Sequence, residues 1–295
     1  MTAVASAVDL NDPAYYINRE LSILDFNLRV LEQATDTRHP LLERLTFLLI
    51  FSRNLDEFFE IRVAGLLQQV ALGRISTGPD GLLPQEVLKQ IADTCHAAVD
   101  RQYRILNEDL LPALAAENIR FLRREEWDEK QSAWVRKYFK EQVMPVLTPI
   151  GLDPSHPFPV LTNKGLYLLA LLRDPASGEL RRAVVPVPRI LPRILGLSDR
   201  KSFTFLSQVI QLFIHRLFPG LELQGSWAFR ITRNSDLYID EEESENLLKK
   251  IEEELLVGGP EGDEADEGEV GRGALEGRPA HRGVVDLVAQ GGRTH

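Results

Sequence analysis

The feature that most constrains the fold is a long apolar stretch interrupted by a short polar cluster. Residues 41–51 (LLERLTFLLIF) are apolar almost all round, which is typical of a helix at the centre of a bundle. Residues 52–57 (SRNLDE) follow, and an amphipathic pattern resumes directly after them. A core helix gains nothing from charged and amide groups at that point unless they face water, cap a helix or contact a ligand. The cluster is therefore the first candidate binding site in the chain.

Residues 15–118 predict an antiparallel helical bundle, and residues 1–14 before it are expected to form a mobile leader. Apolar residues recur at helical spacing in this region, and the connections between the periodic segments are short. Residues 22–25 (SILD) match a capping box at the start of the first helix. Asn54 has the character of an N-cap, with Glu57 three residues later, so a helix is expected to begin directly after it.

Glycine and proline mark the other expected helix boundaries. Gly73 ends the helix that follows the polar cluster, and Pro84 opens another long helix with one apolar face. Pro112 is expected to start a new turn rather than to lie within a helix. Cys95 falls on the apolar face of the helix from Pro84, so it is expected to be a small buried hydrophobe.

Residues 119–257 predict a second domain with antiparallel strands, which gives the chain an α+β fold. Prolines crowd residues 145–159, so this segment is expected to be an extended loop. Residues 258–295 are polar, rich in glycine and without period, and are expected to be disordered. Strands are expected at residues 119–122, 165–173, 181–187 and 227–232, the second and third forming a hairpin, and helices at residues 127–143, 206–217 and 241–256.

Composition argues against several classes of function. The formal net charge is −10, which disfavours nonspecific binding of nucleic acid, because such binding needs a basic surface. No apolar run reaches the length of a membrane span, and the N-terminus does not match a signal peptide. The chain has 1 cysteine, which excludes an internal disulfide framework and fits a reducing compartment. A cytoplasmic protein is the expectation.

The motifs of common catalytic sites are absent from the sequence. No glycine-rich loop ends in Gly-Lys-Ser or Gly-Lys-Thr, and the 6 histidines show no metal-ligand spacing. None of the histidines is followed two residues later by lysine, so no His-x-Lys nucleophile is present. We therefore predict no catalytic residue and no metal ligand in this chain.

Two other features keep a structural and a functional interpretation open. His156 lies in a proline-stiffened loop, where it either shapes a turn or contacts a partner or a phosphate. The second domain is also locally basic, and such charges are either simply solvated or face a polyanion. The basic residues are Arg181, Arg182, Arg189, Arg193, Arg200 and Lys201.

Asn54 likewise has two interpretations. It caps a helix, or its amide reads the edge of an adenine ring, because an amide offers a hydrogen-bond donor and an acceptor together. The two roles are compatible where a helix end lies at a cleft.

Six segments of the chain resemble the larger bacterial polyphosphate kinase family, in order and in register. They are spread from residue 16 to about residue 255, over both predicted domains. The segments are residues 16–31 (YINRELSILDFNLRVL), 40–48 (PLLERLTFL), 54–59 (NLDEFF), 152–159 (LDPSHPFP), 186–189 (PVPR) and 229–237 (FRITRNSDL).

The resemblance implies part of a four-domain enzyme. The family has a helical N-terminal domain, a head domain used in dimerisation and two C-terminal phospholipase-D-like domains. It moves the γ-phosphate of ATP onto polyphosphate through a phosphohistidine, with Mg²⁺. Its ATP-contacting asparagine matches Asn54, which is thereby implied to be an ATP-binding residue. The phosphoacceptor histidine and the metal-associated arginines belong to the C-terminal domains, which the matched segments do not reach.

These observations lead to one main hypothesis and two rivals. The chain is expected to be the ATP-recognising and dimerising front part of a polyphosphate kinase, with ATP and polyphosphate as partners and no phosphorylation of its own. A frameshift or a truncated gene after about residue 255 is expected, since the resemblance stops where the sequence loses its pattern. The alternatives are a non-catalytic dimerisation module derived from that kinase and a stand-alone nucleotide sensor.

Overall fold

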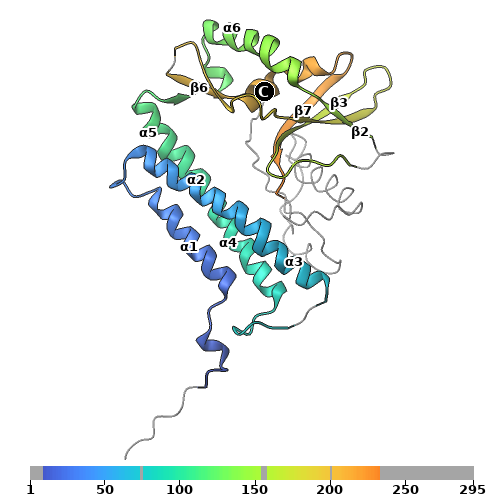
Figure 1. Cartoon of the computed structure of the whole chain (residues 1–295). Coiled ribbons are helices and arrows are strands. Elements are labelled where there is room, and N and C mark those ends of the chain that lie inside the picture. The colour runs from blue at the N-terminus through green and yellow to red at the C-terminus, as the bar shows by residue number, and fades with distance from the viewer. Residues whose placement is uncertain (1–8, 74–75, 154–157, 200, 233–295) are drawn as a thin grey trace, which may run out of the picture. The chain divides into compact units, whose positions relative to one another are not determined.

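The computed structural model describes residues 9–73, 76–153, 158–199 and 201–232 (Figure 1). The chain divides into two compact units, the first ending at Pro112 and the second beginning at Ala113. The leader up to residue 8, His156, Arg200, the predicted helix 241–256 and the predicted disordered tail lie outside the described residues.

The first unit is built from helices. A short 3₁₀ turn, η1 (Pro13–Tyr15), precedes α1, which packs against both α2 and α4. A π-helical turn, η2 (Phe59–Val63), joins α2 to α3, and a second, η3 (Ile105–Leu110), joins α4 to α5. The α-helices are α1 (Arg19–Gln33), α2 (Leu41–Phe58), α3 (Ala64–Ala71), α4 (Pro84–Arg104) and α5 (Leu111–Ala116). In Figure 1, α3 continues α2 end to end, and α1 and α4 lie beside this long helix.

The predicted start of the first helix is wrong by several residues. Asn18 is the N-cap of α1, and its Oδ1 accepts from the backbone N–H groups of Glu20 and Leu21 at 3.0 and 3.1 Å. Ser22 lies inside the helix and is exposed, so residues 22–25 form no capping box. An asparagine accepts from free helix N–H groups as well as a serine does, and the helix begins at the earlier of the two candidates.

The predicted helix start at Asn54 is also wrong. Helix α2 begins after Pro40 and runs through Asn54 to Phe58, then continues through η2 into α3. The buried residues of this helix keep their helical spacing through the polar cluster at residues 52–57. The buried apolar residues of this face are Leu48, Phe51, Leu55 and Phe58.

The end of this helix and the start of α4 agree with the boundaries predicted from the sequence. Gly73 ends the α2–α3 helix in the left-handed region at φ 65°, as predicted, and Pro84 is the first residue of α4.

Pro112 was expected to start a new turn, but it lies inside a helix that continues to Ala116. The π-helical turn η3 precedes it, and such a widened turn accommodates a proline that cannot donate an ordinary helical hydrogen bond.

A buried arginine fastens α2 to the rest of the first unit. Arg44 is 6% exposed, and its Nε donates to the carbonyl oxygen of Ala34 at 2.8 Å, just beyond α1. Its Nη2 pairs with the carboxylate of Asp109 on η3. One side chain thus links three helical segments, and its charge is stable there only because both contacts compensate for lost water.

The second unit combines two sheets with two principal helices. A 4-stranded antiparallel sheet has the order β2-β4-β3-β7, and a 3-stranded sheet has the order β1-β6-β5 with β1 parallel to β6. The strands are β1 (Arg120–Phe121), β2 (Ile150–Leu152), β3 (Leu166–Arg173), β4 (Leu180–Pro186), β5 (Ile194–Gly196), β6 (Ser202–Phe205) and β7 (Glu222–Arg230), and the helices are α6 (Glu129–Tyr138) and α7 (Leu206–Phe213).

Each face of the larger sheet buries a separate core. Leu168, Ala170 and Val185 pack with residues of α6 and α7, while Leu169 and Val184 on the opposite face pack with residues that include Phe158 and Leu161. Both faces of β3 are therefore covered, which explains why its sequence is a nearly continuous apolar run rather than an alternating one.

The α+β class and the hairpin of β3 and β4 are confirmed. Prediction missed β2, which lies within the expected loop 145–159, and also β5 and β6. Among the described helices, none combines the length and the apolar character that a membrane span requires.

We predict that Asp109→Asn lowers the free energy of unfolding by about 1–3 kcal/mol, because it leaves the buried Arg44 with a weaker partner. The matched control is Glu32→Gln, which removes an exposed contact with Arg101 at 4.0 Å and is expected to change stability by less than about 1 kcal/mol. Urea denaturation measures both. Equal effects of the two substitutions would contradict a special role for Arg44.

Candidate functional site around Asn54

Asn54 is held by a buried amide on the neighbouring helix. Its Nδ2 donates to the Oδ1 of Asn27 on α1 at 3.0 Å. Asn27 is only 4% exposed, and its own Nδ2 donates to the carbonyl oxygen of Phe51 on α2 at 3.1 Å. The two amides therefore bridge α1 and α2, and they fix the plane and the orientation of the Asn54 side chain.

The bridge leaves Asn54 with unused hydrogen-bonding capacity. One of its two Nδ2 hydrogens serves Asn27, and within the described ranges no donor reaches its Oδ1. The side chain is half-buried, so it is neither sealed in the core nor fully in water. A donor and an acceptor in one plane, pre-oriented by a buried partner, are the groups that an amide needs to read the edge of an adenine ring.

The surroundings of Asn54 combine polar and apolar side chains. Arg53 and Glu57 of the polar cluster are exposed, whereas Asp56 is buried and engaged in an interaction. Ile61 is 53% exposed, two helical turns beyond Asn54, and Phe26, beside Asn27 in α1, is 55% exposed. Both helices thus present exposed apolar side chains in addition to the polar groups.

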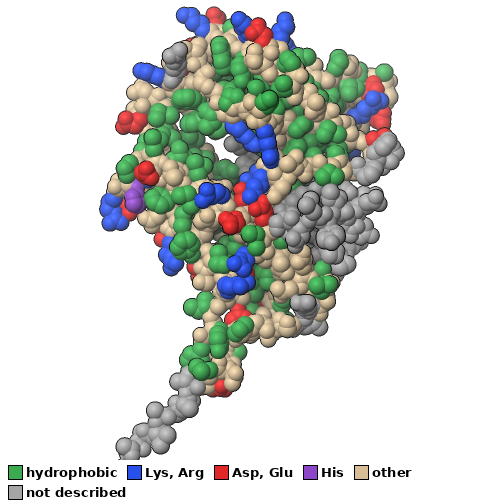
Figure 2. Space-filling view, in the orientation of Figure 1, with side chains coloured by type: hydrophobic (Ala, Val, Ile, Leu, Met, Phe, Trp, Pro, Cys, Tyr) green, Lys and Arg blue, Asp and Glu red, His purple; other side chains and the backbone are tan. Residues whose placement is uncertain are grey.

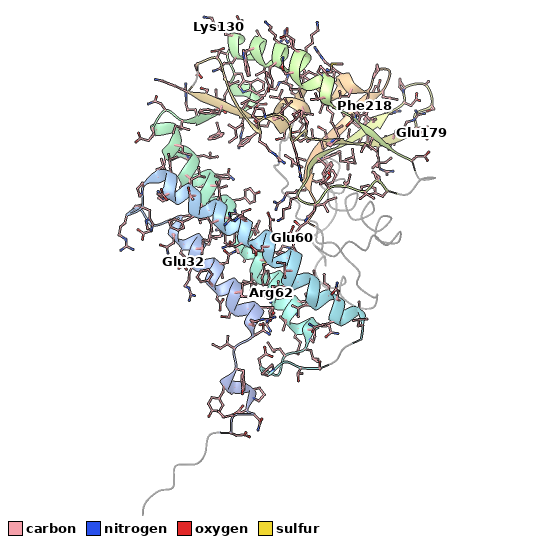
Figure 3. The ribbon with its side chains drawn as sticks, viewed as in Figure 1. Glu32, Glu60, Arg62, Lys130, Glu179 and Phe218 are labelled. Atoms are coloured by element: carbon pink, nitrogen blue, oxygen red, sulfur yellow. The ribbon has the colours of Figure 1, made fainter. Side chains whose placement is uncertain are left out.

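Figure 3 shows the same helices with their side chains. Glu60 and Arg62 lie on the continuous α2–α3 helix shortly after the polar cluster, and Glu32 lies on α1 beside it. Charged side chains thus follow the polar cluster along the same helix.

The other candidate residues do not join this site. Cys95 is buried in α4, as predicted. His39 packs its ring against Phe47 at 5.2 Å and contacts the Oε1 of Gln33. Arg181 pairs with Asp174 and with a second carboxylate at the β3–β4 turn, so its charge is locally compensated. In the part of the chain that the structure describes, no three His, Cys, Asp or Glu side chains gather as metal ligands do.

Sequence reasoning missed Asn27, the partner of Asn54. A signal was available, since Asn27 lies between Leu24 and Leu31 at the spacing of a buried helix face. An amide at such a position needs a hydrogen-bonding partner, because an unpaired one is costly in a core.

Comparison with known proteins agrees with both units. The chain matches the polyphosphate kinase N-terminal domain family over residues 16–122 and the polyphosphate kinase middle domain family over residues 130–256. It is 50% identical over 254 residues to polyphosphate kinase of Pseudomonas aeruginosa, a match that covers 84% of this chain and 37% of the relative. It is 46% identical over 256 residues to polyphosphate kinase of Xylella fastidiosa, covering 84% of this chain and 36% of that relative.

A solved structure supports the same assignment. The crystal structure of polyphosphate kinase from Porphyromonas gingivalis aligns with a TM-score of 0.69 and 28% identity, over 81% of this chain and 37% of that one. The fold and the sequence thus define a part of a phosphotransferase. The chain belongs to the polyphosphate kinase family and carries its N-terminal and middle domains, spanning a little over a third of the length of the relatives it matches.

The family implies Mg²⁺, and the described residues do not fit that ion. Mg²⁺ requires several oxygen ligands at short range, and the described ranges hold no suitable group of acidic side chains.

We predict that Asn27→Ala lowers the free energy of unfolding by about 1–3 kcal/mol, because it removes the buried link between α1 and α2 and leaves a small void. Asn107→Ala is the matched control, since Asn107 is exposed on η3 and is expected to change stability by less than about 0.5 kcal/mol. Chemical denaturation measures both, and a loss no larger than the control's would mean that the amide bridge contributes little.

Proposed function

We propose that this chain is the nucleotide-recognising part of a polyphosphate kinase, in which Asn54 hydrogen-bonds the adenine ring of ATP. The observation that carries the proposal is the amide bridge: Asn27 holds Asn54 in one orientation while a donor hydrogen and the acceptor Oδ1 stay available. Membership of the polyphosphate kinase family supports ATP as the ligand, because the resemblance implies transfer of the γ-phosphate of ATP onto polyphosphate.

Pre-orientation matters because an amide on a free side chain loses rotamer entropy when it binds. Asn54 has already lost that freedom through Asn27, so less of its hydrogen-bond energy is spent on ordering. The same geometry explains why a base rather than a phosphate is the expected ligand, since an uncharged amide interacts only weakly with a multiply charged anion.

The proposal extends to the two domains and to assembly. Residues 15–118 form the nucleotide-contacting helical domain and residues 119–257 the head domain, through which the protein forms a homodimer. In the complete enzyme these domains serve the transfer of the terminal phosphate of ATP to polyphosphate. The family's use of ATP and the single cysteine of the chain, which excludes an internal disulfide, support a cytoplasmic location.

We further propose that this chain does not become phosphorylated by itself. Phosphoryl transfer requires a nucleophile, neutralisation of the phosphate charge and positioning at the same time. Asn54 supplies only part of the positioning, and the described ranges offer no metal-ligand group.

We predict that Asn54→Ala weakens ATP binding by about 5- to 150-fold, since an amide–adenine pair contributes roughly 1–3 kcal/mol. Isothermal titration calorimetry measures the affinity, with GTP as a second ligand. The variant is expected to lose most of the preference for ATP over GTP, because the amide reads the base and not the phosphates.

Two controls isolate the contact with the base. Asn107→Ala removes an exposed amide from the same unit and should leave both affinities unchanged. Asn27→Ala keeps Asn54 but frees it to rotate, so it should weaken ATP binding by less than Asn54→Ala does. An unchanged ATP affinity in Asn54→Ala would eliminate the proposed contact.

We predict that incubation of the 295-residue chain with γ-labelled ATP leaves the protein unlabelled. The polyphosphate kinase of Pseudomonas aeruginosa, treated in parallel, controls for the assay conditions. Acid-labile, stoichiometric labelling of a histidine in this chain would refute the proposal that the chain is inactive alone.

A further inference from the structure

The acidic net charge of the chain conceals local concentrations of positive charge. Although the formal net charge is −10, lysine and arginine side chains gather in several groups on the face shown in Figure 2. One such group lies in the second unit, where the charges of its members act on one another. It comprises Arg189, Arg193 and Arg230, which come from three different segments of the chain.

The start of β3 brings two of these segments together. In the larger sheet β3 lies between β4 and β7, and Leu166, its first residue, pairs with Arg230 at the end of β7. On the other side, the carbonyl oxygen of Leu166 accepts from the N–H of Val187, directly after β4, at 2.9 Å. Arg189 follows two residues later, so the chain leaving β4 and the end of β7 flank one point of the sheet.

A hydrogen bond of its side chain holds Arg189 at this corner. The Nη2 of Arg189 donates to the carbonyl oxygen of Asn163 at 3.0 Å, just before β3 begins. The next residue, Lys164, donates its N–H to the carbonyl oxygen of Ile231 at 2.8 Å. The loop that contains Lys164, a further cation, is therefore hydrogen-bonded to the residue that follows Arg230.

Arg193 completes the group from a third segment. It immediately precedes β5, and its carbonyl oxygen accepts from the N–H of Leu206 at the start of α7 at 2.9 Å. Partial burial and the like charges of Arg189 and Arg230 lower the pKa of Arg193. A guanidinium nevertheless remains protonated at neutral pH, so the three charges persist side by side.

Two of the three arginines have no acidic partner among the described residues. Across the described ranges, neither Arg189 nor Arg193 forms an ion pair with a carboxylate, and no carboxylate contributes to the shift of Arg193. Both side chains are exposed, so an anion from solution can reach them. The contrast is Arg181 in the same unit, which pairs with Asp174 at 3.2 Å and with Glu179 at 3.2 Å.

We propose that Arg189, Arg193 and Arg230 form a binding site for the phosphate chain of a linear polyanion, either inorganic polyphosphate or the triphosphate of a nucleotide. Guanidinium groups donate pairs of hydrogen bonds to phosphate oxygens in a fixed fork, and several of them on a short arc match a ligand with repeated charges. The site lies in the second unit and does not depend on the adenine contact of Asn54 in the first.

The test compares one double variant with one single variant, which remove positive charge from different places. In Arg189→Gln/Arg193→Gln the two exposed members of the group are neutralised, and Arg181→Gln is the control at the β3–β4 turn. Isothermal titration calorimetry of the full 295-residue chain uses short-chain polyphosphate, tripolyphosphate, ATP and orthophosphate as ligands. Circular dichroism and thermal unfolding establish that each variant is folded.

The double variant is expected to bind polyphosphate at least about tenfold more weakly, because it loses charge-assisted hydrogen bonds from two guanidinium groups. Arg181→Gln is expected to keep the wild-type affinity. Binding should weaken as salt rises, with a smaller slope in the double variant, since fewer ions are displaced. Arg193→Lys keeps the charge without the fork and is expected to lose less affinity than Arg193→Gln.

The ligands distinguish the two sources of the phosphate chain. If polyphosphate binds with higher affinity than both tripolyphosphate and ATP, the site is assigned to the polymer. If ATP and tripolyphosphate bind with equal affinity, the site is assigned to the triphosphate of a nucleotide. Asn54→Ala should leave polyphosphate binding unchanged, so a failure of the adenine contact and a failure of this site are separate results. Absence of saturable binding, or equal losses in the double variant and Arg181→Gln, overturns the inference.

Discussion

The unbroken helix that carries residues 52–57 is the constraint on which the first unit depends. Leu48, Phe51, Leu55 and Phe58 keep one buried face across the cluster, so the polar groups must be placed around a helix and not at its end. Asn54 then falls toward α1, where only a hydrogen-bonding residue can meet it without leaving an unsatisfied amide. The packing of apolar side chains thereby dictates where the candidate site lies and which neighbour supports it.

The errors in predicting helix starts show which energies compete. A capping hydrogen bond stabilises a helix by about 1 kcal/mol, whereas burial of each large apolar side chain contributes roughly 1.5–3 kcal/mol. At Asn54 the local cap motif and the buried face disagree, and the buried face prevails. At Pro84 and Gly73 no such conflict exists, because proline and glycine restrict the backbone itself, and both boundaries are predictable.

Elements whose partners are distant in sequence were the hardest to predict. The β3–β4 hairpin has its turn and both strands within one short segment, so its sequence contains the whole signal. Strand β6 is only Ser202–Phe205 and is defined by β1 and β5, of which β1 lies about eighty residues earlier. The role of Asn27 can likewise be recognised only once Asn54 is known to be its hydrogen-bonding partner. The type of each long element was therefore readable, while these tertiary pairings were not.

The two proposed sites, one in each unit, use different kinds of side chain. An amide discriminates a base but contributes little against several negative charges, and a guanidinium holds phosphate oxygens but does not distinguish adenine from guanine by itself. The net charge of −10 repels a polyanion at long range, yet the Debye length is only about 8 Å at physiological ionic strength. Charges close to a ligand therefore outweigh the distant net charge, and for this reason the proposed site at Arg189, Arg193 and Arg230 is compatible with an acidic chain.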